Sequence, residues 1–148
     1  MRAVIQRVTR SRVGVADRIA GAIERGLVVL LGVAASDEES DADWLLDKLL
    51  DLRIFENEAG KFDRSLRDIG GELLVVSQFT LFADTRKGRR PSFSAAAPPA
   101  LAIRLYDRFV ARARAQGFTV ASGEFGAHMH VELVNDGPVT IILDTRDR

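Results

Sequence analysis

The chain has 148 residues with 21 basic and 21 acidic side chains, so its formal net charge is zero, which argues against a strongly basic nucleic-acid-binding protein. Its 47% apolar content is typical of a globular protein, and we expect a single domain over residues 1–148. The absence of cysteine excludes disulfides and thiolate metal sites and favours a cytoplasmic location, and no apolar run approaches the roughly 20 residues that cross a membrane.

The N-terminal part predicts three strands. Valines and an isoleucine in residues 3–15 favour a first strand, and a turn near residues 16–18 returns residues 19–24 as its hairpin partner. The continuous apolar run at 26–33 indicates a buried strand.

A helix follows, with recognisable punctuation. Ser36 and Glu39 fit a capping box, and the acidic residues beside them suit the positive end of the helix dipole. Its predicted buried stripe consists of Leu45, Leu46, Leu49, Leu50 and Leu52. Residues 52–55 then predict a short strand, and residues 56–61 a turn.

Residues 71–82 give the strongest strand pattern, yet polar residues interrupt its end. Strand alternation places Gln78 and Thr80 on one face and Ser77 and Phe79 on the other. Either the strand emerges into solvent here, or these groups line a polar pocket that could hold an oxyanion. Thr80 has no identifiable base beside it, so the residues themselves do not support a hydroxyl nucleophile.

A basic loop and a second helix come next. Four cations lie within five positions, and they are Arg86, Lys87, Arg89 and Arg90. Pro98 and Pro99 begin a helix that Gly117 ends, and this helix carries four further arginines at 104, 108, 112 and 114. A polyanion could bind these basic surfaces locally, although solvated surface arginines explain them equally well.

The remainder, from Phe118 to about Asp144, predicts β structure. In VELVNDGPVTIIL (131–143), two apolar runs flank a predicted hairpin turn at residues 135–138. Pro138 removes a backbone donor where pairing should resume, so it either stiffens the turn or helps to present Gly137-Pro138 to another group. His128 and His130 share a strand face, but no third ligand has recognisable spacing, so we expect surface histidines and no metal.

The order of elements predicts a mixed α/β fold with two main helices against largely antiparallel sheets. Neither a nucleophile with its base nor a phosphate-binding loop can be identified from the residues.

Three motifs, SQFTL (77–81), ADT…RPSFS (83–94) and NDGPVT (135–140), together resemble the D-aminoacyl-tRNA deacylases (D-tyrosyl-tRNA deacylases), as do IQRVTR and RIF (53–55). The resemblance runs from Met1 to about Leu143. It implies a layered α/β/β fold and a cytoplasmic homodimer without cofactor, whose active sites are completed across the interface. The implied reaction is hydrolysis of the ester of D-aminoacyl-tRNA, and of glycyl-tRNA mischarged on tRNA-Ala.

The resemblance also assigns roles to residues. Ser77, Gln78, Phe79 and Thr80 would form the catalytic segment, with backbone N–H groups of Phe79 and Thr80 as oxyanion donors. Each subunit would insert a cis Gly137-Pro138 peptide into the other's active site and so reject L-aminoacyl groups.

Further residues support these roles in the family. Arg7 would brace the Gly-Pro loop, against the alternative that it protects a strand edge. Phe125 and Met129 would bind the adenosine, against ordinary core packing. The cations at 86–90 and the arginines of the second helix would face tRNA phosphates.

Two rival functions stay open at this point. One is a non-catalytic dimer that binds tRNA, and the other is a related editing deacylase with a different chiral preference.

Overall fold

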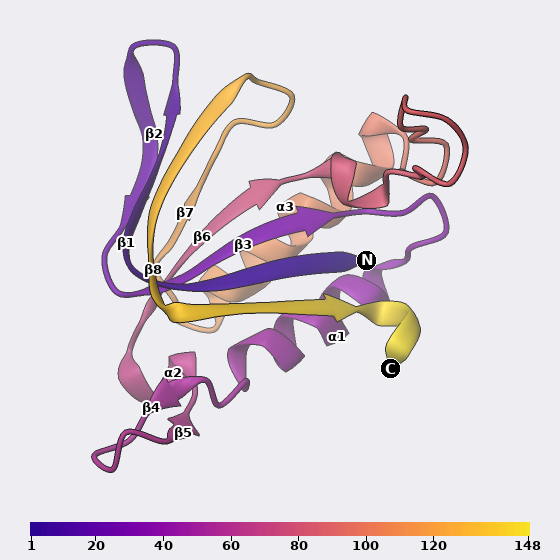
Figure 1. Cartoon of the computed structure of the whole chain (residues 1–148). Coiled ribbons are helices and arrows are strands. Elements are labelled where there is room, and N and C mark those ends of the chain that lie inside the picture. Colours follow the sequence, from indigo (N-terminus) through magenta and orange to yellow (C-terminus); the bar gives the residue numbers. More distant parts are fainter.

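One long strand organises the sheet in the computed structural model, which describes residues 1–148 (Figure 1). Strand β1 pairs antiparallel with β8 along one side, and with β3 and then β2 along the other. Beyond β3, the strands β6 and β7 continue the sheet in parallel. The bounds are β1 Arg2–Val15, β2 Arg18–Ile23, β3 Gly26–Gly32, β6 Glu72–Ser77, β7 Val120–Ser122 and β8 Met129–Asp144.

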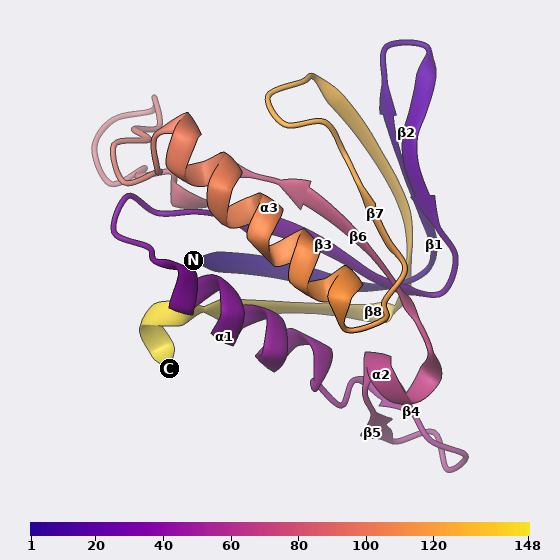
Figure 2. The same cartoon turned by 180° about the vertical axis from the view of Figure 1, so that it is seen from behind.

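Two helices cover one face of this sheet. Helices α1 (Glu39–Leu50) and α3 (Pro99–Ala115) lie side by side in Figure 2. The four leucines of α1 at 45, 46, 49 and 50 are fully buried, and Leu52 packs beside them, because their spacing keeps them on one helix face. The mixed α/β class, the two main helices and the largely antiparallel sheet are therefore confirmed.

Smaller elements connect these layers. Strands β4 (Phe55–Glu56) and β5 (Phe62–Arg64) form a separate antiparallel pair, followed by the short helix α2 (Leu66–Ile69). Two 3₁₀ helices, η1 (Phe79–Phe82) and η2 (Thr145–Asp147), follow the ends of β6 and β8. The predicted strand at 52–55 is thus shifted, since pairing begins at Phe55.

The predicted capping box of α1 is wrong. The reciprocal pair is Glu38 with Asp41, and Ser36 lies in a turn before the helix. Asp37 explains the shift, because its carboxylate accepts hydrogen bonds from the Ala34 amide and the Met1 ammonium. The chain therefore turns once more before the helix begins.

The predicted hairpin at residues 131–143 is also wrong. Both halves of β8 pair with β1 and not with each other, since Val8 lies opposite Asn135 and Gln6 opposite Thr140. Residues 136–139 consequently bulge out opposite Arg7 alone. In Figure 1 the paired strands β1 and β8 both bend sharply along their length.

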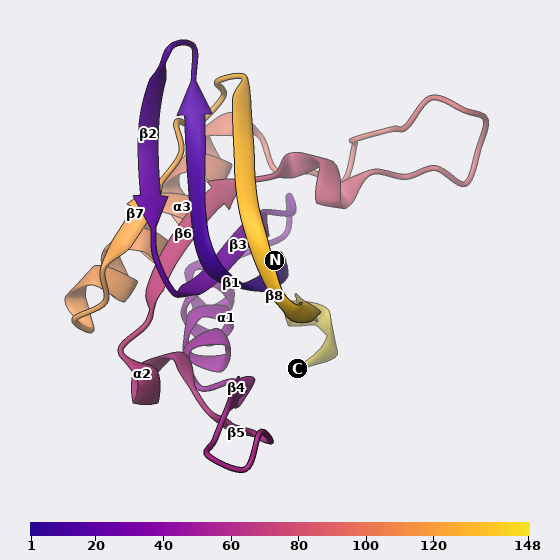
Figure 3. The same ribbon diagram turned by 60° about the vertical axis from the view of Figure 1, so that its left-hand side comes forward.

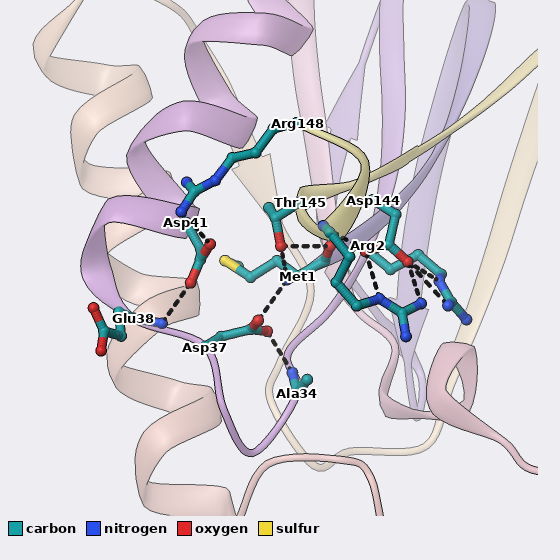
Figure 4. Close-up of polar contacts among 10 residues, drawn as sticks. Met1, Arg2, Ala34, Asp37, Glu38, Asp41, Asp144, Thr145 and Arg148 are labelled. Atoms are coloured by element: carbon teal, nitrogen blue, oxygen red, sulfur yellow. Dashed lines mark hydrogen bonds and ion pairs between the residues drawn. The ribbon is translucent and has the colours of Figure 1, made fainter.

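The first residues of β1 lie beside the end of β8 (Figure 4). The Met1 ammonium donates to Asp37 Oδ1 at 2.7 Å and to the Thr145 hydroxyl, while the Thr145 amide donates to the Met1 carbonyl at 2.9 Å. These contacts tie the turn before α1 to the start of β1 and to the end of β8.

Candidate functional site

A cavity of about 600 Å³ lies at the end of β6, which is within the size range of small-molecule sites. Its walls include Ser77, Gln78 and Phe79 from the end of β6, and Phe125 and Met129 from the segment around the start of β8. Five residues that the sequence analysis singled out, from two segments far apart in the chain, therefore line the same cavity.

The cavity exists because many of its lining side chains are small. They include Ala96, Ala97 and Ala102, together with Gly126 and Ala127 next to Phe125 in the chain. The Ala97 amide donates to the carbonyl of Val33, another wall residue, at 2.9 Å and so fixes this part of the wall to the end of β3. Sequence reasoning missed these residues, although the run SAAAPPA (94–100) indicated a segment without side-chain bulk.

The polar segment at the end of β6 is a 3₁₀ turn and not a strand. Gln78 leaves the strand with φ −142° and ψ 78°, and the amides of Leu81 and Ala83 then donate to the carbonyls of Gln78 and Thr80. The predicted alternation of side chains past Ser77 is therefore wrong. The amides of Phe79 and Thr80 donate no hydrogen bond within the chain, as is usual for the first N–H groups of a helix.

The Thr80 hydroxyl accepts a hydrogen bond from the side-chain amide of Gln78, at 2.5 Å between Nε2 and Oγ1. An amide N–H group is a donor and cannot remove the hydroxyl proton. Phe79 next to it is exposed, and its ring meets Phe93 edge-on at 5.0 Å between centroids. The turn thus offers main-chain donors and an aromatic rim.

Phe125 is too exposed to be a core residue, whereas Met129 is half-buried and packs against the smaller apolar cluster. The Phe125 ring meets Tyr106 edge-on, at 6.4 Å between centroids. The Tyr106 hydroxyl donates to the carbonyl of Val75 in β6 at 2.7 Å. Burial raises the pKa of Tyr106 to about 12. Sequence reasoning missed Tyr106, although it is the sole tyrosine.

Gly137 and Pro138 lie exposed on the bulge of β8, and neither residue lines the cavity. Their peptide bond is cis. The Asn135 side chain closes the bulge, because its Oδ1 accepts from the Val139 amide at 2.7 Å and its Nδ2 donates to the Val139 carbonyl at 3.2 Å.

Arg7 on β1 binds the backbone of the bulge and so supports it. Its Nε donates to the Asp136 carbonyl at 2.8 Å and its Nη1 to the Ile54 carbonyl at 2.7 Å. The residue is only 4% exposed, and its strand is paired on both sides, so it does not protect a sheet edge. The Phe62 ring lies 5.4 Å from the guanidinium carbon and covers it.

The basic loop extends far from the sheet in Figure 3. Lys87, Arg89 and Arg90 are exposed there, while Arg86 is paired with Asp84. That pairing holds the pKa of Asp84 at about 2, chiefly through the Arg86 side-chain hydrogen bond.

The expectation that α3 faces tRNA stays a prediction, but two of the four arginines of this helix form ion pairs with α1. Arg108 pairs with Glu39 and Asp43, and Arg112 pairs with Asp43 and Asp47. They join α3 to α1 because acidic and basic residues recur along the two facing helix surfaces.

The two histidines do not share a strand as predicted, because His128 precedes β8 and lines the cavity while His130 lies within the strand. Their rings meet edge-on at 5.1 Å between centroids. No group of three residues able to ligate a metal occurs. No helix is both long and apolar enough to cross a membrane.

Comparisons with known proteins point in one direction. The family model described as D-Tyr-tRNA(Tyr) deacylase matches residues 4–144. A D-aminoacyl-tRNA deacylase of Herpetosiphon aurantiacus is 62% identical over 99% of this chain and 96% of its own, and one of Clostridioides difficile is 61% identical over 98% and 97%.

Solved structures show the same fold. One described as a c-Myc DNA unwinding element binding protein has a TM-score of 0.91 at 42% identity, covering 97% of this chain and 98% of its own. Another, described as a probable eukaryotic D-amino acid tRNA deacylase, has a TM-score of 0.85 at 20% identity, covering 96% and 97%.

Proposed function

The chain belongs to the D-Tyr-tRNA(Tyr) deacylase family and is a hydrolase of D-aminoacyl-tRNA, and we propose that it cleaves the ester in the cavity at the end of β6. The assignment of the site rests on the N–H groups of Phe79, which lines the cavity, and of Thr80, which follows it in the turn but does not line the cavity, since neither group donates within the chain. Because charged tRNA is the substrate, we also propose that the enzyme acts in the cytoplasm.

Main-chain groups supply the catalysis in this proposal. Water attacks the ester carbonyl carbon, and the amides of Phe79 and Thr80 donate to the oxygen that gains negative charge. The bond from carbon to the ribose oxygen then breaks, and the proton of the water passes to that ribose oxygen with help from the neighbouring 2′-hydroxyl. Ser77 and Gln78 position the substrate, and no cofactor or metal takes part.

Chiral selection comes from the bulge of β8. In a homodimer, Gly137 and Pro138 of one subunit enter the cavity of the partner, where their rigid main chain leaves no room for an L side chain. The exposure of both residues and the bracing by Arg7 support this role, since a steric filter must not yield. Glycine has no side chain to reject, so glycyl-tRNA passes the same filter.

The terminal adenosine lies against Phe125 and Met129 in this proposal. The exposed Phe125 ring has Tyr106 behind it, and an aromatic ring with such support can stack on a base.

Lys87, Arg89 and Arg90 contact the tRNA phosphates. Replacing all three by glutamine should raise KM and lower the slope of log KM against log salt by about one for each phosphate that is no longer neutralised. Arg12→Gln, at an exposed arginine already paired with Glu132, is the matched control and should leave the slope unchanged. An unchanged slope in the triple variant would place the tRNA elsewhere.

A deacylation assay with D-tyrosyl-, L-tyrosyl- and glycyl-tRNA tests the function. We expect release of D-tyrosine and glycine in the presence of EDTA, with the L-ester spared. Faster cleavage of the L-ester would favour an editing deacylase of different chiral preference. Binding without cleavage of any ester would favour a tRNA-binding dimer.

Subunit mixing tests whether the bulge acts on the partner. Ala96→Leu fills the cavity of a subunit and should be nearly inactive, while Gly137→Ala damages only the bulge and should cleave the L-ester as well as the D-ester. After random exchange of an equal mixture, half of the intact cavities face an intact bulge, so L-ester cleavage per intact cavity should fall by about half. Unchanged L-ester cleavage on mixing would mean that the bulge does not act across an interface.

A further inference from the structure

Arg2, at the start of β1, contacts the 3₁₀ helix η1, which carries the free amides of Phe79 and Thr80. It does so from outside the cavity. Its Nη1 donates to the Leu81 carbonyl at 2.6 Å, and its guanidinium carbon lies 5.0 Å from the centroid of the Phe82 ring. Arg2 does not line the cavity, and the reaction described above does not use it. Any effect of Arg2 on the reaction therefore passes through the 3₁₀ helix that it holds.

The Leu81 carbonyl is one of the acceptors that a short helix leaves without an internal partner at its C-terminal end. The amide of the same residue donates to the Gln78 carbonyl at 3.2 Å and so closes the turn around the two free N–H groups. A shift at Leu81 would therefore reorient the amides of Phe79 and Thr80. Gly32 limits other movements, since a Cβ atom there would lie 3.1 Å from Gln78, Leu81 and Phe82.

Asp144 fixes Arg2 in turn (Figure 4). Its Oδ2 accepts from Arg2 Nε at 3.0 Å, and it also accepts from the side chain and the backbone amide of Arg146. These contacts, those of Arg146 first and that of Arg2 after them, hold the pKa of Asp144 far below its usual range. The carboxylate therefore stays charged at neutral pH, although its burial by itself would raise its pKa.

We propose that Arg2 is a positioning residue for ester hydrolysis, which it serves by holding the 3₁₀ helix η1 so that the free amides of Phe79 and Thr80 meet the developing oxyanion. The alternative is a purely structural link between β1 and the end of β8. The inference rests on the proposed function, and it assigns to Arg2 an effect on the chemical step rather than on tRNA binding.

Kinetics of Arg2→Ala, Arg2→Lys and Arg12→Ala separate the two roles. With each protein verified as folded at the assay temperature, Arg2→Ala should lower kcat for D-tyrosyl-tRNA at least tenfold and leave KM within about twofold. Arg2→Lys should restore part of kcat, because an ammonium group can still donate to the Leu81 carbonyl. Arg12→Ala removes an exposed arginine of the same strand and should match the wild type.

A wild-type kcat in folded Arg2→Ala would overturn the proposal, as would a loss of kcat that Arg2→Lys does not relieve at all. Hydrogen exchange of the free protein provides a readout that needs no substrate. The amides of Leu81 and Ala83 should exchange about tenfold faster in Arg2→Ala, while the amides in the centre of β3 keep their wild-type rates.

Unchanged exchange at Leu81 would show that Arg2 does not hold the turn and would overturn the inference by itself. Failure of the wild type to cleave any D-aminoacyl-tRNA would instead overturn the proposed function.

Discussion

The end of β6 and the bulge of β8 are both places where a strand leaves its regular pairing, but they treat the freed backbone groups in opposite ways. After Ser77, the amide of Phe79, which lines the cavity, and the amide of its neighbour Thr80 remain without partners. In the bulge, Asn135 and Arg7 bind the main chain of Val139 and Asp136. The first region keeps donors available for a substrate, whereas the second uses side chains to make the main chain rigid. Chemistry and selection thus make different demands on the backbone.

The largest expected effect comes from breaking the bulge at Gly137. Its φ of 148° is one that L residues rarely adopt, and a Cβ atom would lie 2.7 Å from the Val139 side chain and 2.9 Å from its amide. Gly137→Ala should therefore lower the ratio of D- to L-ester cleavage by about 10²-fold, because the filter is displaced and no longer excludes the L side chain.

Gly60→Ala is the control for that change. Gly60 also has positive φ, but it has open space around it and lies in the turn after β4, so the enzyme should keep wild-type kinetics. Equal losses in both variants would mean that backbone strain, and not the bulge, causes the effect.

Removing the support of the bulge should cost stability as well as selection. Arg7→Ala leaves the buried carbonyl of Ile54 and the half-buried carbonyl of Asp136 without a charged donor, so we expect a loss of about 3 kcal/mol in the free energy of unfolding measured in urea. The ratio of D- to L-ester cleavage should fall in the same variant.

Arg7→Lys should recover only part of both losses, because one ammonium group cannot replace the fork that reaches two carbonyls. Full recovery would show that charge alone, without the paired geometry, supports the bulge.

The contact of Tyr106 in α3 with the Val75 carbonyl in β6 should be sensitive to alkali. Folded Tyr106 has a pKa of about 12, above the usual value of about 10, so its contribution is complete below pH 10 and is lost as pH rises towards 12. The free energy of unfolding should fall by about 2–3 kcal/mol across that range.

Tyr106→Phe removes the ionisable group and should abolish this fall, at a cost of about 1 kcal/mol at pH 7. Thermal unfolding of both proteins from pH 8 to pH 12 provides the measurement. An identical alkaline loss in the variant would assign the titration to another group.

The smallest effect on kcat is expected from removing the hydroxyl of Thr80. Thr80→Ala keeps the two main-chain donors, so kcat should fall less than about tenfold. Loss of all turnover in a folded Thr80→Ala protein that still binds substrate would favour a hydroxyl nucleophile. It would also remove the contrast between the two regions.

The sequence predicted elements whose pattern is local. The strands β1 to β3 and the helices α1 and α3 were predicted correctly, because apolar periodicity and helix-breaking residues act over a few positions. The errors at 78–82 and 131–143 have a different origin. The path of each segment depends on a distant partner, namely β3 for the first and the whole length of β1 for the second.

The candidate site was predictable only in part. Motif resemblance singled out Ser77, Gln78 and Phe79 together with Phe125, and the structure places them around one cavity. It gave no reason to add Ala96 or Tyr106. The cavity depends on small side chains such as Ala96. The contact of Tyr106 with Phe125 depends on packing between segments far apart in the sequence.

The ion pairs between α1 and α3 have a consequence for the long-range electrostatics. Acidic residues of α1 are neutralised by Arg108 and Arg112, so this side of the protein contributes little net field. In the 86–90 loop only Arg86 is paired with a carboxylate, that of Asp84, while Lys87, Arg89 and Arg90 form no ion pair. The protein therefore has an electric dipole although its net charge is zero. The field of an approaching polyanion would orient the protein with the 86–90 loop towards it before any contact forms.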